Sequence, residues 1–277
     1  MKKVSTEKFN LNDGTFIRYI KIGSGKPILL LHTFRNRLEY SSELYKLLKK
    51  KFSVYVIDLP GFGDSPINCE TNYNIDFFTK SIADFINKKK LHNLIIAGES
   101  IGAILAASVA NKMPNYIKKI YMFNPYDFDT FFGEGISRGN FFARFIFFHI
   151  SLPVIGVFFS ALENKLILKR VMHGGFFNSD KLSNNYLDLL CKSIKKDGYS
   201  YHFRNVLFNF CRNSQIKRIY KNLKVPRELI YGENDWANQS ERLETQNHLK
   251  VSKFNIIKKS IHFSFLENPM EVSKIII

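Results

Sequence analysis

Cysteine is scarce in this sequence, and its scarcity excludes a fold held together by disulfide bonds. The 277 residues contain three cysteines, Cys69, Cys191 and Cys211, an odd number of residues that lie far apart in the chain. That usage is typical of a reducing compartment, so we expect a cytoplasmic protein. The opening residues MKKVSTEKFN contain lysines with no apolar run behind them, so we expect no secretory signal peptide.

Acidic residues are also in short supply, which raises the question of an anionic partner. Asp and Glu number 24 against 41 Lys and Arg, giving a formal net charge of +17. The basic residues are scattered, with no run longer than three lysines (49–51 and 88–90), whereas nucleic-acid-binding proteins usually gather their charge on one face. Lysine, asparagine, isoleucine and phenylalanine are abundant, as expected from an AT-rich genome. We therefore expect no nucleic-acid partner.

Several other signatures are missing. The composition, with 45% hydrophobic and 23% charged residues, excludes a disordered chain, collagen and a coiled coil. The sequence has no phosphate-binding P-loop, no dinucleotide fingerprint and no cluster of metal-ligating residues, so we expect neither a cofactor nor a metal. What remains is a globular chain long enough to bury a large core.

Short apolar or alternating runs are present, and helical stretches separate them. The expected strands are 16–22, 27–32, 52–58, 94–98, 117–123, 227–231 and 254–258. The expected helices include 41–51, 75–89, 101–113 and 241–248. Strands that are apolar throughout are typical of a sheet covered on both faces. The pattern predicts an α/β fold with a mostly parallel twisted sheet, helices on both faces and right-handed connections.

The strand pattern is interrupted once. Residues 126–223 are helical and rich in phenylalanine, with no strand-like run bounded by turn residues. The predicted α/β core therefore consists of residues 1–125 and 224–277, and residues 126–223 form a helical insertion.

One segment of the insertion, 145–162, has 18 residues without Asp, Glu, Lys or Arg. Its length qualifies it as a membrane span, but a single span would place strands of one sheet on opposite sides of the bilayer. Pro153 and Gly156 also interrupt the run near its middle. We predict two buried helices that cover an apolar pocket, with their phenylalanines facing the sheet. The alternative, which we do not favour, is a hairpin on an anionic membrane surface, flanked by Arg138, Arg144, Lys165, Lys169 and Arg170.

A G-x-S-x-G motif, Gly98-Glu99-Ser100-Ile101-Gly102, lies between the strand 94–98 and the helix 101–113. By composition alone such a pentapeptide would occur in roughly 6% of chains like this one, so its position matters more than its letters. A sharp turn from strand to helix needs small residues at both flanks. It raises the serine above the carboxyl edge of the sheet, where the helix N-terminus favours developing negative charge. Ser100 is the predicted nucleophile.

A serine nucleophile needs a base and a carboxylate that orients it. His262 follows the last strand directly and is the histidine best placed to reach Ser100. Asp235 follows the strand 227–231 and reaches the same edge, where it would fix the tautomer of the imidazole. Glu233 in the same loop and Asp127 after the strand 117–123 are the competing carboxylates.

The chain order Ser100, Asp235, His262 resembles that of the α/β-hydrolase superfamily. The resemblance covers essentially the whole chain, and it rests on the motifs GESIG (98–102), YGENDW (231–236), HFSFLENP (262–269) and DLPGFGDS (58–65). It implies that residues 126–223 are the cap of the family. It also implies an oxyanion hole made by the backbone N–H groups of Phe34 and Ile101.

The sequence departs from the family pattern at two places. Thr33 stands where the family often has glycine after the third strand, which stiffens the loop that carries Phe34. Ile261 stands where glycine commonly precedes the histidine, which leaves the role of His262 unaffected.

The resemblance also implies the chemistry. A serine at the motif, where some relatives carry aspartate and attack alkyl halides or epoxides, points to attack on a carbonyl group and an acyl-enzyme. The aromatic cap suggests a small or medium apolar ester or related carbonyl compound as substrate. Arg35 and Arg37 are candidates for binding a substrate carboxylate or phosphate, and Trp236 is expected to pack. The alternatives are a carbon–carbon bond hydrolase, an acyltransferase, a membrane-associated lipid hydrolase and a non-catalytic ligand receptor.

Overall fold

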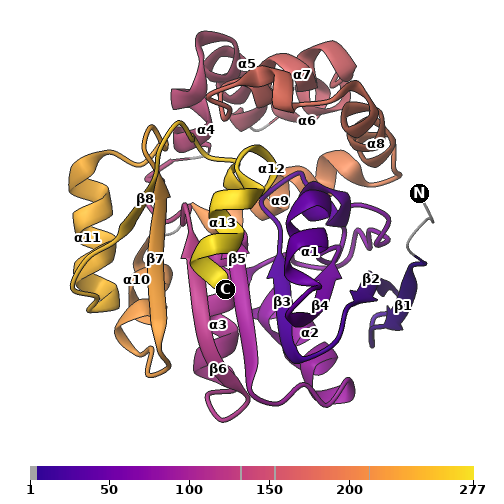
Figure 1. Cartoon of the computed structure of the whole chain (residues 1–277). Helices are drawn as coiled ribbons and strands as arrows, with labels where there is room; N and C mark the ends of the chain where they lie inside the picture. Colours follow the sequence, from indigo (N-terminus) through magenta and orange to yellow (C-terminus); the bar gives the residue numbers. More distant parts are fainter. Residues whose placement is uncertain (1–4, 132, 153, 212) are drawn as a thin grey trace.

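The computed structural model describes residues 5–131, 133–152, 154–211 and 213–277, and these contain one eight-stranded sheet (Figure 1). The strands are β1 (Glu7–Asn10), β2 (Phe16–Ile22), β3 (Lys26–Leu31), β4 (Phe52–Ile57), β5 (Leu94–Glu99), β6 (Ile117–Phe123), β7 (Arg227–Gly232) and β8 (Asn255–Ile257). Their order is β1-β2-β4-β3-β5-β6-β7-β8. β2 is antiparallel to β1 and β4, and all other pairs are parallel. The predicted fold class is confirmed.

The apolar runs form strands because both of their faces are buried. Along β3, Leu29 and Leu31 enter one apolar core, whereas Ile28 and Leu30 enter a second core on the opposite face. This alternation follows from the two-residue period of a strand. Strand β1 was not expected from the sequence, because this four-residue edge strand is almost entirely exposed and has no apolar pattern.

Helices cover both faces of the sheet. In the core they are α1 (Ser42–Leu48), α2 (Ile75–Lys88), α3 (Ile101–Lys112), α10 (Asn213–Lys221), α11 (Gln239–Leu249), α12 (Ser264–Glu267) and α13 (Pro269–Ile276). The helices α2 and α3 pack together on one face, and α1 and α13 pack together on the other. Neither layer covers the carboxyl ends of β5 and β7, so the loops that follow these strands can carry functional residues.

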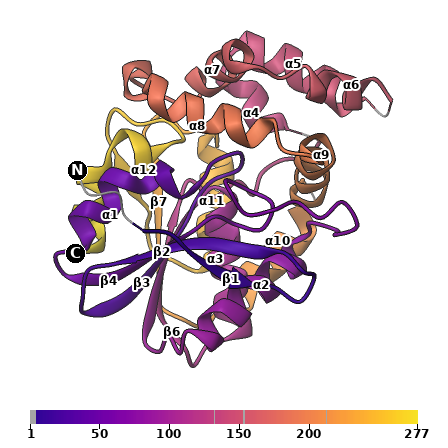
Figure 2. The ribbon, with the colours of Figure 1, turned by 90° about the vertical axis from the view of Figure 1, so that its right-hand side faces the viewer.

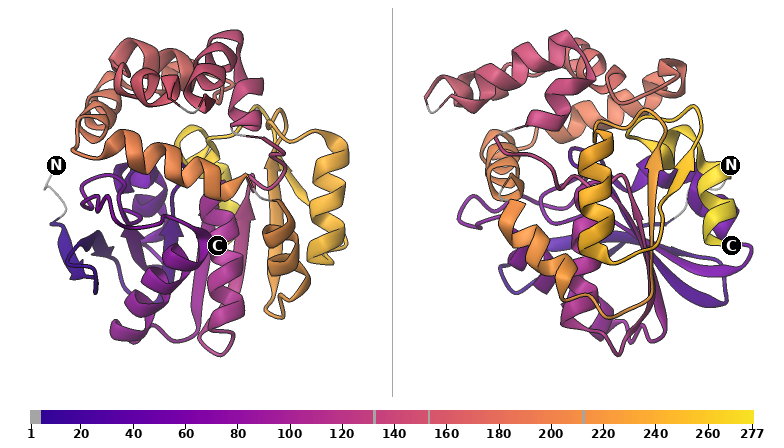
Figure 3. Two further views of the ribbon diagram at one scale, coloured as in Figure 1. Left: turned by 180° about the vertical axis from the view of Figure 1, so that it is seen from behind. Right: turned by 90° about the vertical axis from the view of Figure 1, so that its left-hand side faces the viewer.

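Most of the chain between β6 and β7 forms a separate layer of helices. Its helices are α4 (Glu134–Gly139), α5 (Phe141–Ser151), α6 (Ile155–Ala161), α7 (Lys165–His173), α8 (Asn184–Ile194) and α9 (Tyr199–Phe210). These six, which we call the cap helices, lie above the edge at which β5 ends (Figures 2 and 3). The next helix, α10, packs instead on α3 and α11, beside the sheet.

The apolar segment 145–162 forms parts of two helices, α5 and α6, as predicted. Pro153 lies outside the described residues. Gly156, which we expected to interrupt the run, lies inside α6, where an added Cβ would come within 2.1 Å of the carbonyl oxygen of Ile150. That glycine therefore permits close packing of α6 on α5.

The predicted burial of the phenylalanines in this segment is only partly right. Phe147 is fully buried, but Phe145, Phe148 and Phe158 are 48%, 61% and 73% exposed. The reason is that α5 has apolar side chains on two opposite faces, and only one of them can pack on the protein below it. Among the described residues, no helix has both the length and the apolar content needed to cross a bilayer.

Candidate active site

Ser100 lies at a sharp turn between β5 and α3. Its φ of 59° and ψ of −120° are rare for a residue with a side chain, and a backbone bond from its N–H to the oxygen of Phe123 (2.9 Å) holds the turn. A Cβ on Gly98 would lie 2.1 Å from the oxygen of Gly102, and a Cβ on Gly102 would lie 2.5 Å from the oxygen of Leu31. Both flanking positions therefore require glycine.

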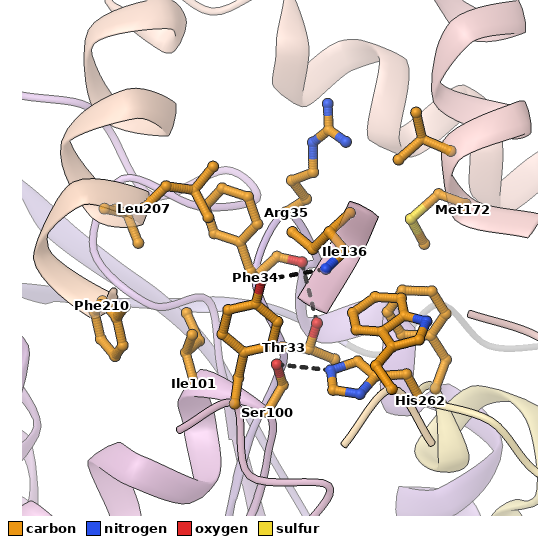
Figure 4. Close-up of a pocket in the computed structure, with 15 residues that line it drawn as sticks. Thr33, Phe34, Arg35, Ser100, Ile101, Ile136, Met172, Leu207, Phe210 and His262 are labelled. Atoms are coloured by element: carbon orange, nitrogen blue, oxygen red, sulfur yellow. Dashed lines mark hydrogen bonds between the residues drawn. The ribbon is translucent and has the colours of Figure 1, made fainter. Parts of the chain in front are cut away.

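The structure brings Ser100, His262 and Asp235 together. The Nε2 atom of His262 lies 2.9 Å from Ser100 Oγ (Figure 4), and its Nδ1 atom lies 2.6 Å from Asp235 Oδ1. All three side chains are almost completely buried. Because Nδ1 faces a carboxylate it carries the proton, which leaves Nε2 free to accept the hydrogen bond of the serine hydroxyl.

The two competing carboxylates have other partners. Asp127 accepts a hydrogen bond from Thr245 Oγ1 (2.8 Å), and Glu233 accepts one from the backbone N–H of Lys259 (3.0 Å). Within the described part of the chain, neither contacts His262. Burial raises the pKa of the Asp127 carboxyl from its ordinary 3.8 to about 7.

This shifted pKa predicts a pH-dependent effect of Asp127→Asn on stability. The folded state keeps the proton of Asp127 between pH 4 and pH 7, whereas the unfolded state loses it, so the free energy of unfolding falls as the pH rises through this range. The side-chain oxygen of asparagine can still accept the hydrogen bond of Thr245, but the amide does not titrate in this pH range. Between pH 5 and pH 7 the variant should gain about 2 kcal/mol relative to the wild type, measured by urea unfolding at both pH values. The titration of other buried groups affects both proteins equally, so it cancels when the variant is compared with the wild type. If the two proteins differ in free energy of unfolding by the same amount at pH 5 and at pH 7, Asp127 is not protonated in the folded state.

Two polar residues at strand ends hold the loop that carries His262. Asn124, directly after β6, donates from Nδ2 to the oxygen of His262 (3.0 Å) and accepts at Oδ1 from the N–H of Gly232 (2.7 Å). Glu99, the last residue of β5, accepts from the N–H of Phe265 (3.1 Å) and from the hydroxyl of Tyr40. Burial raises the pKa of Glu99 well above its ordinary value. Neither role was predicted from the sequence, although the positions of both residues directly at strand ends were a usable signal.

Trp236 does more than the packing that we expected of it. Its ring lies flat on the imidazole of His262, with centroids 3.9 Å apart and an angle of 13° between the planes. Its indole N–H donates to the oxygen of Gly174 (2.9 Å), and the backbone N–H of His262 donates to the oxygen of Gly175 (3.0 Å). An aromatic face in this position favours a positively charged partner, here the imidazolium that forms when His262 takes a proton.

Substitution of Trp236 should therefore affect turnover in a manner that depends on the aromatic ring. Trp236→Leu should lower kcat by about tenfold, because a stacked cation–aromatic contact contributes on the order of 1–2 kcal/mol. Trp236→Phe keeps a ring at the same place and should retain most of the turnover. Steady-state kinetics on a small ester separates this effect from substrate binding, since the loss should appear in kcat rather than in KM. Equal turnover of both variants would contradict the stacking role.

His32 shapes the neighbouring turn, as expected from its place after β3. Its Nε2 accepts from the N–H of Leu59 (3.0 Å), so Nδ1 carries the proton and donates to the oxygen of Thr33 (2.7 Å). Burial lowers the pKa of His32 to about 4, which keeps the ring neutral. The ring thereby ties the loop that carries Phe34 to the loop 58–65.

Arg35 has a different partner from the one we expected. Its guanidinium forms an ion pair with Glu163, which lies between α6 and α7, and it stacks over the ring of Phe203 at 4.6 Å. The hydroxyl of Tyr199 also donates to Glu163 (2.7 Å). Arg37 is likewise paired, with Glu39 and Asp64. The expected role of Arg35 as a ligand for a substrate anion stays a prediction, and this pairing speaks against it: the charge of Arg35 is balanced by Glu163, and the ion pair joins the loop after β3 to the cap helices.

A mostly apolar pocket opens above Ser100. Its walls come from the sheet edge and the cap helices, and they include Thr33, Phe34, Arg35, Ile101, Tyr126, Ile136, Val171, Met172, Val206, Leu207, Phe210, Trp236 and Phe263 (Figure 4). Phe34 and Ile101, the residues expected to form an oxyanion hole, both lie beside Ser100 in this pocket. Ile101 begins α3, so its N–H is among the first-turn donors that have no acceptor within the helix. Within the described ranges, no group of three or more His, Cys, Asp or Glu side chains is arranged to hold a metal ion.

Comparison with known proteins gives consistent matches. A family model described as "alpha/beta hydrolase fold" matches residues 26–146. Putative esterase/lipase 2 of Mycoplasma genitalium is 30% identical over 104 residues, which are 37% of this chain and 39% of that protein. Human epoxide hydrolase 4 is 24% identical over 284 residues, which cover 96% of this chain and 75% of that protein. The solved structure of the epoxide hydrolase CorEH, 16% identical, superimposes with a TM-score of 0.81 and covers 99% of this chain and 97% of that one.

Proposed function

The chain belongs to the α/β-hydrolase superfamily, and we propose that within this superfamily it is a serine hydrolase that cleaves apolar esters. Its relatives are named as esterases, lipases and epoxide hydrolases, which supports hydrolase activity in general. One observation carries the finer proposal: the hydrogen-bonded series Ser100, His262 and Asp235 lies at the floor of an apolar pocket.

The reaction would begin with attack by Ser100 on the carbonyl carbon of the ester. As the Oγ–C bond forms, His262 Nε2 takes the hydroxyl proton, and Asp235 stabilises the resulting imidazolium. The carbonyl oxygen becomes an oxyanion that accepts hydrogen bonds from the N–H groups of Phe34 and Ile101. Each such donor contributes on the order of 3 kcal/mol to the stability of the tetrahedral intermediate.

The second half of the reaction would release both products. His262 returns its proton to the leaving alkoxide, the ester C–O bond breaks, and the acyl group stays on Ser100. A water molecule then attacks the acyl carbon while His262 Nε2 takes its proton. Collapse of the second tetrahedral intermediate frees the carboxylic acid, and the proton on His262 restores the hydroxyl of Ser100.

The identity of the nucleophile separates this proposal from epoxide or haloalkane hydrolysis. Members of the superfamily that attack those substrates carry aspartate at the turn between strand and helix, whereas this chain carries Ser100. A serine attacks carbonyl carbons and forms an ester intermediate that water can cleave.

The pocket supports an uncharged acyl group of small or medium size. Its lining is mostly aliphatic and aromatic, and the guanidinium of Arg35 is neutralised by Glu163. A carboxylate in the acyl chain would therefore lose its hydration with no free cation among the described lining residues to replace it. This argument selects neutral esters over half-esters of dicarboxylic acids.

A panel of p-nitrophenyl esters tests the proposal. We expect kcat/KM to rise from acetate to a medium acyl chain and to fall for palmitate, because side chains of the cap helices line the pocket and limit the length of the acyl group. A half-ester of glutarate should be hydrolysed far more slowly than the butyrate ester of similar length. Absence of hydrolysis with every member of the panel, in a protein shown to be folded by circular dichroism, would exclude an esterase.

A further inference from the structure

Helix α5 has apolar side chains on two opposite faces, but only one of these faces is covered. Ile146, Phe147 and Ile150 are buried against the rest of the protein. On the opposite face, Phe141, Phe145 and Phe148 are 85%, 48% and 61% exposed. Their spacing of four and three residues places them in one row along the helix. A surface helix normally buries its apolar face and exposes polar side chains on the opposite one, so this outer apolar row lacks a cover.

The exposed row of α5 is part of a larger apolar surface, which we call the cap face. It consists of Phe141, Phe145, Phe148, Val154, Ile155, Val157, Phe158, Leu162 and Leu166, all at least 48% exposed. These nine are about half of the seventeen large exposed apolar side chains in the described residues, so the exposure is concentrated on one part of the molecule. Helices α5 and α6 pack together, and with α7 they form the layer of the cap that is most distant from the sheet (Figures 1 and 2).

The charge around the cap face is mostly positive. Two of the basic residues there are paired with acids of neighbouring segments, Lys165 with Asp188 and Arg138 with Glu134 and Glu241. Residues 135–178 contain five basic residues and a single acid, Glu163. The side chain of Glu163 is 4% exposed and is paired with Arg35, so it contributes no negative charge to the surface. Among the described residues, Arg144, Lys169 and Arg170 have no acidic partner within ion-pair distance. Basic side chains therefore border an apolar surface that lacks exposed acids of its own.

We propose that the cap face docks on an anionic lipid bilayer, with α5 and α6 lying in the plane of the interface. The exposed phenylalanines would enter the boundary between headgroups and acyl chains, and the bordering basic side chains would contact lipid phosphates. This inference goes beyond the proposed hydrolase activity and does not depend on it. It also reverses the expectation, drawn from the sequence, that these phenylalanines face inward.

Charge decides between a bilayer and a second copy of the chain as the occupant. In a twofold dimer through the cap face, each surface meets itself, so the bordering arginines and lysines would approach their own copies. Among the described residues, Arg144, Lys169 and Arg170 have no acidic partner that would relieve this repulsion. An anionic bilayer instead supplies both an apolar phase for the phenylalanines and negative charge for the rim.

Helix α7 links the cap face to the pocket. Leu166 at its beginning belongs to the cap face, whereas Val171 and Met172 one to two turns later are buried and line the pocket. A docked cap would therefore hold the pocket one helix layer away from the bilayer.

Co-sedimentation with phosphatidylcholine vesicles, with and without phosphatidylglycerol, tests the proposal. We expect strong binding to the anionic vesicles, weak binding to the neutral ones and a loss of binding as salt is raised. The variant F141S/F148S/F158S should bind at least 100-fold more weakly, since three phenylalanines no longer enter the interface. Its matched control, L243S/I256S/M270S, removes three exposed apolar side chains from the core domain at the same net charge and should bind like the wild type.

A second pair of variants tests the charges separately. R144Q/K169Q/R170Q should weaken binding to anionic vesicles by roughly 100-fold, because each basic residue at the surface contributes about fivefold. The control K49Q/K50Q/K51Q lowers the net charge equally at a distant site and should have a much smaller effect. Hydrolysis of a soluble acetate ester, measured in parallel, should be unchanged in all four variants, which separates docking from catalysis.

Two results would overturn the proposal. One is equal binding by each cap variant and its control, which would mean that net charge alone attracts the protein to vesicles. The other is a dimer in analytical ultracentrifugation that F141S/F148S/F158S abolishes, which would identify a second copy as the occupant of the cap face.

Discussion

Ser100→Ala should lower kcat for ester hydrolysis by about 10⁶-fold while leaving the fold intact, because the hydroxyl supplies the attacking oxygen. The side chain of Ser100 makes one hydrogen bond, to His262 Nε2, so its loss costs little stability. The glycines on either side keep the turn unchanged. Steady-state kinetics and thermal unfolding measure the two effects separately.

A residual rate of roughly 10³–10⁴ over the uncatalysed reaction is still expected from the pocket and the oxyanion donors. Ser273→Ala, on α13 and far from the pocket, serves as the control and should hydrolyse esters at the normal rate. If Ser100→Ala keeps near-normal turnover, Ser100 is not the nucleophile and the proposed reaction sequence is wrong.

Asp235→Asn should lower kcat by about 10⁴-fold, again with a folded protein. The carboxylate of Asp235 lies 2.6 Å from Nδ1 of His262 and requires a proton on that nitrogen. An asparagine can turn its NH₂ group toward Nδ1, which moves the ring proton to Nε2. In that tautomer His262 can no longer accept the proton of Ser100.

The competing carboxylates provide the controls for Asp235. Asp127→Asn and Glu233→Gln should each reduce turnover by much less, since these side chains bond Thr245 and the backbone of Lys259. A larger loss for either control than for Asp235→Asn would move the orienting role to that residue.

Much of the sheet was predictable because its strands are buried on both faces. Continuous apolar runs such as 52–57 have no solvent-facing residues, so burial and sequence pattern agree. The hairpin strand β1 escaped prediction because an exposed edge strand needs no apolar residues. Its existence depends on backbone pairing with β2, which the side-chain pattern does not encode.

In the site, residues next to strand ends were easier to predict than contacts that cross between layers. Ser100, Asp235 and His262 each follow a strand closely, and the carboxyl ends of parallel strands meet at one edge. The ion pair of Arg35 with Glu163 depends on how the cap helices pack on the core, and the two residues are 128 positions apart in the sequence. Hydrophobic periodicity shows which side chains share a face of a helix, but it does not show whether another part of the protein packs on that face. The exposure of Phe148 and Phe158 was therefore not predicted.

The central claim, that Ser100 forms the covalent intermediate, is tested most directly by labelling with a fluorophosphonate followed by peptide mapping. The tryptic peptide 91–112 contains two serines, Ser100 and Ser108, so fragmentation of this peptide distinguishes the proposed nucleophile from a buried serine of the same helix region. We expect one adduct per chain, on Ser100, and none in Ser100→Ala. An adduct on any other residue, or no adduct in a protein that hydrolyses esters, would contradict the account.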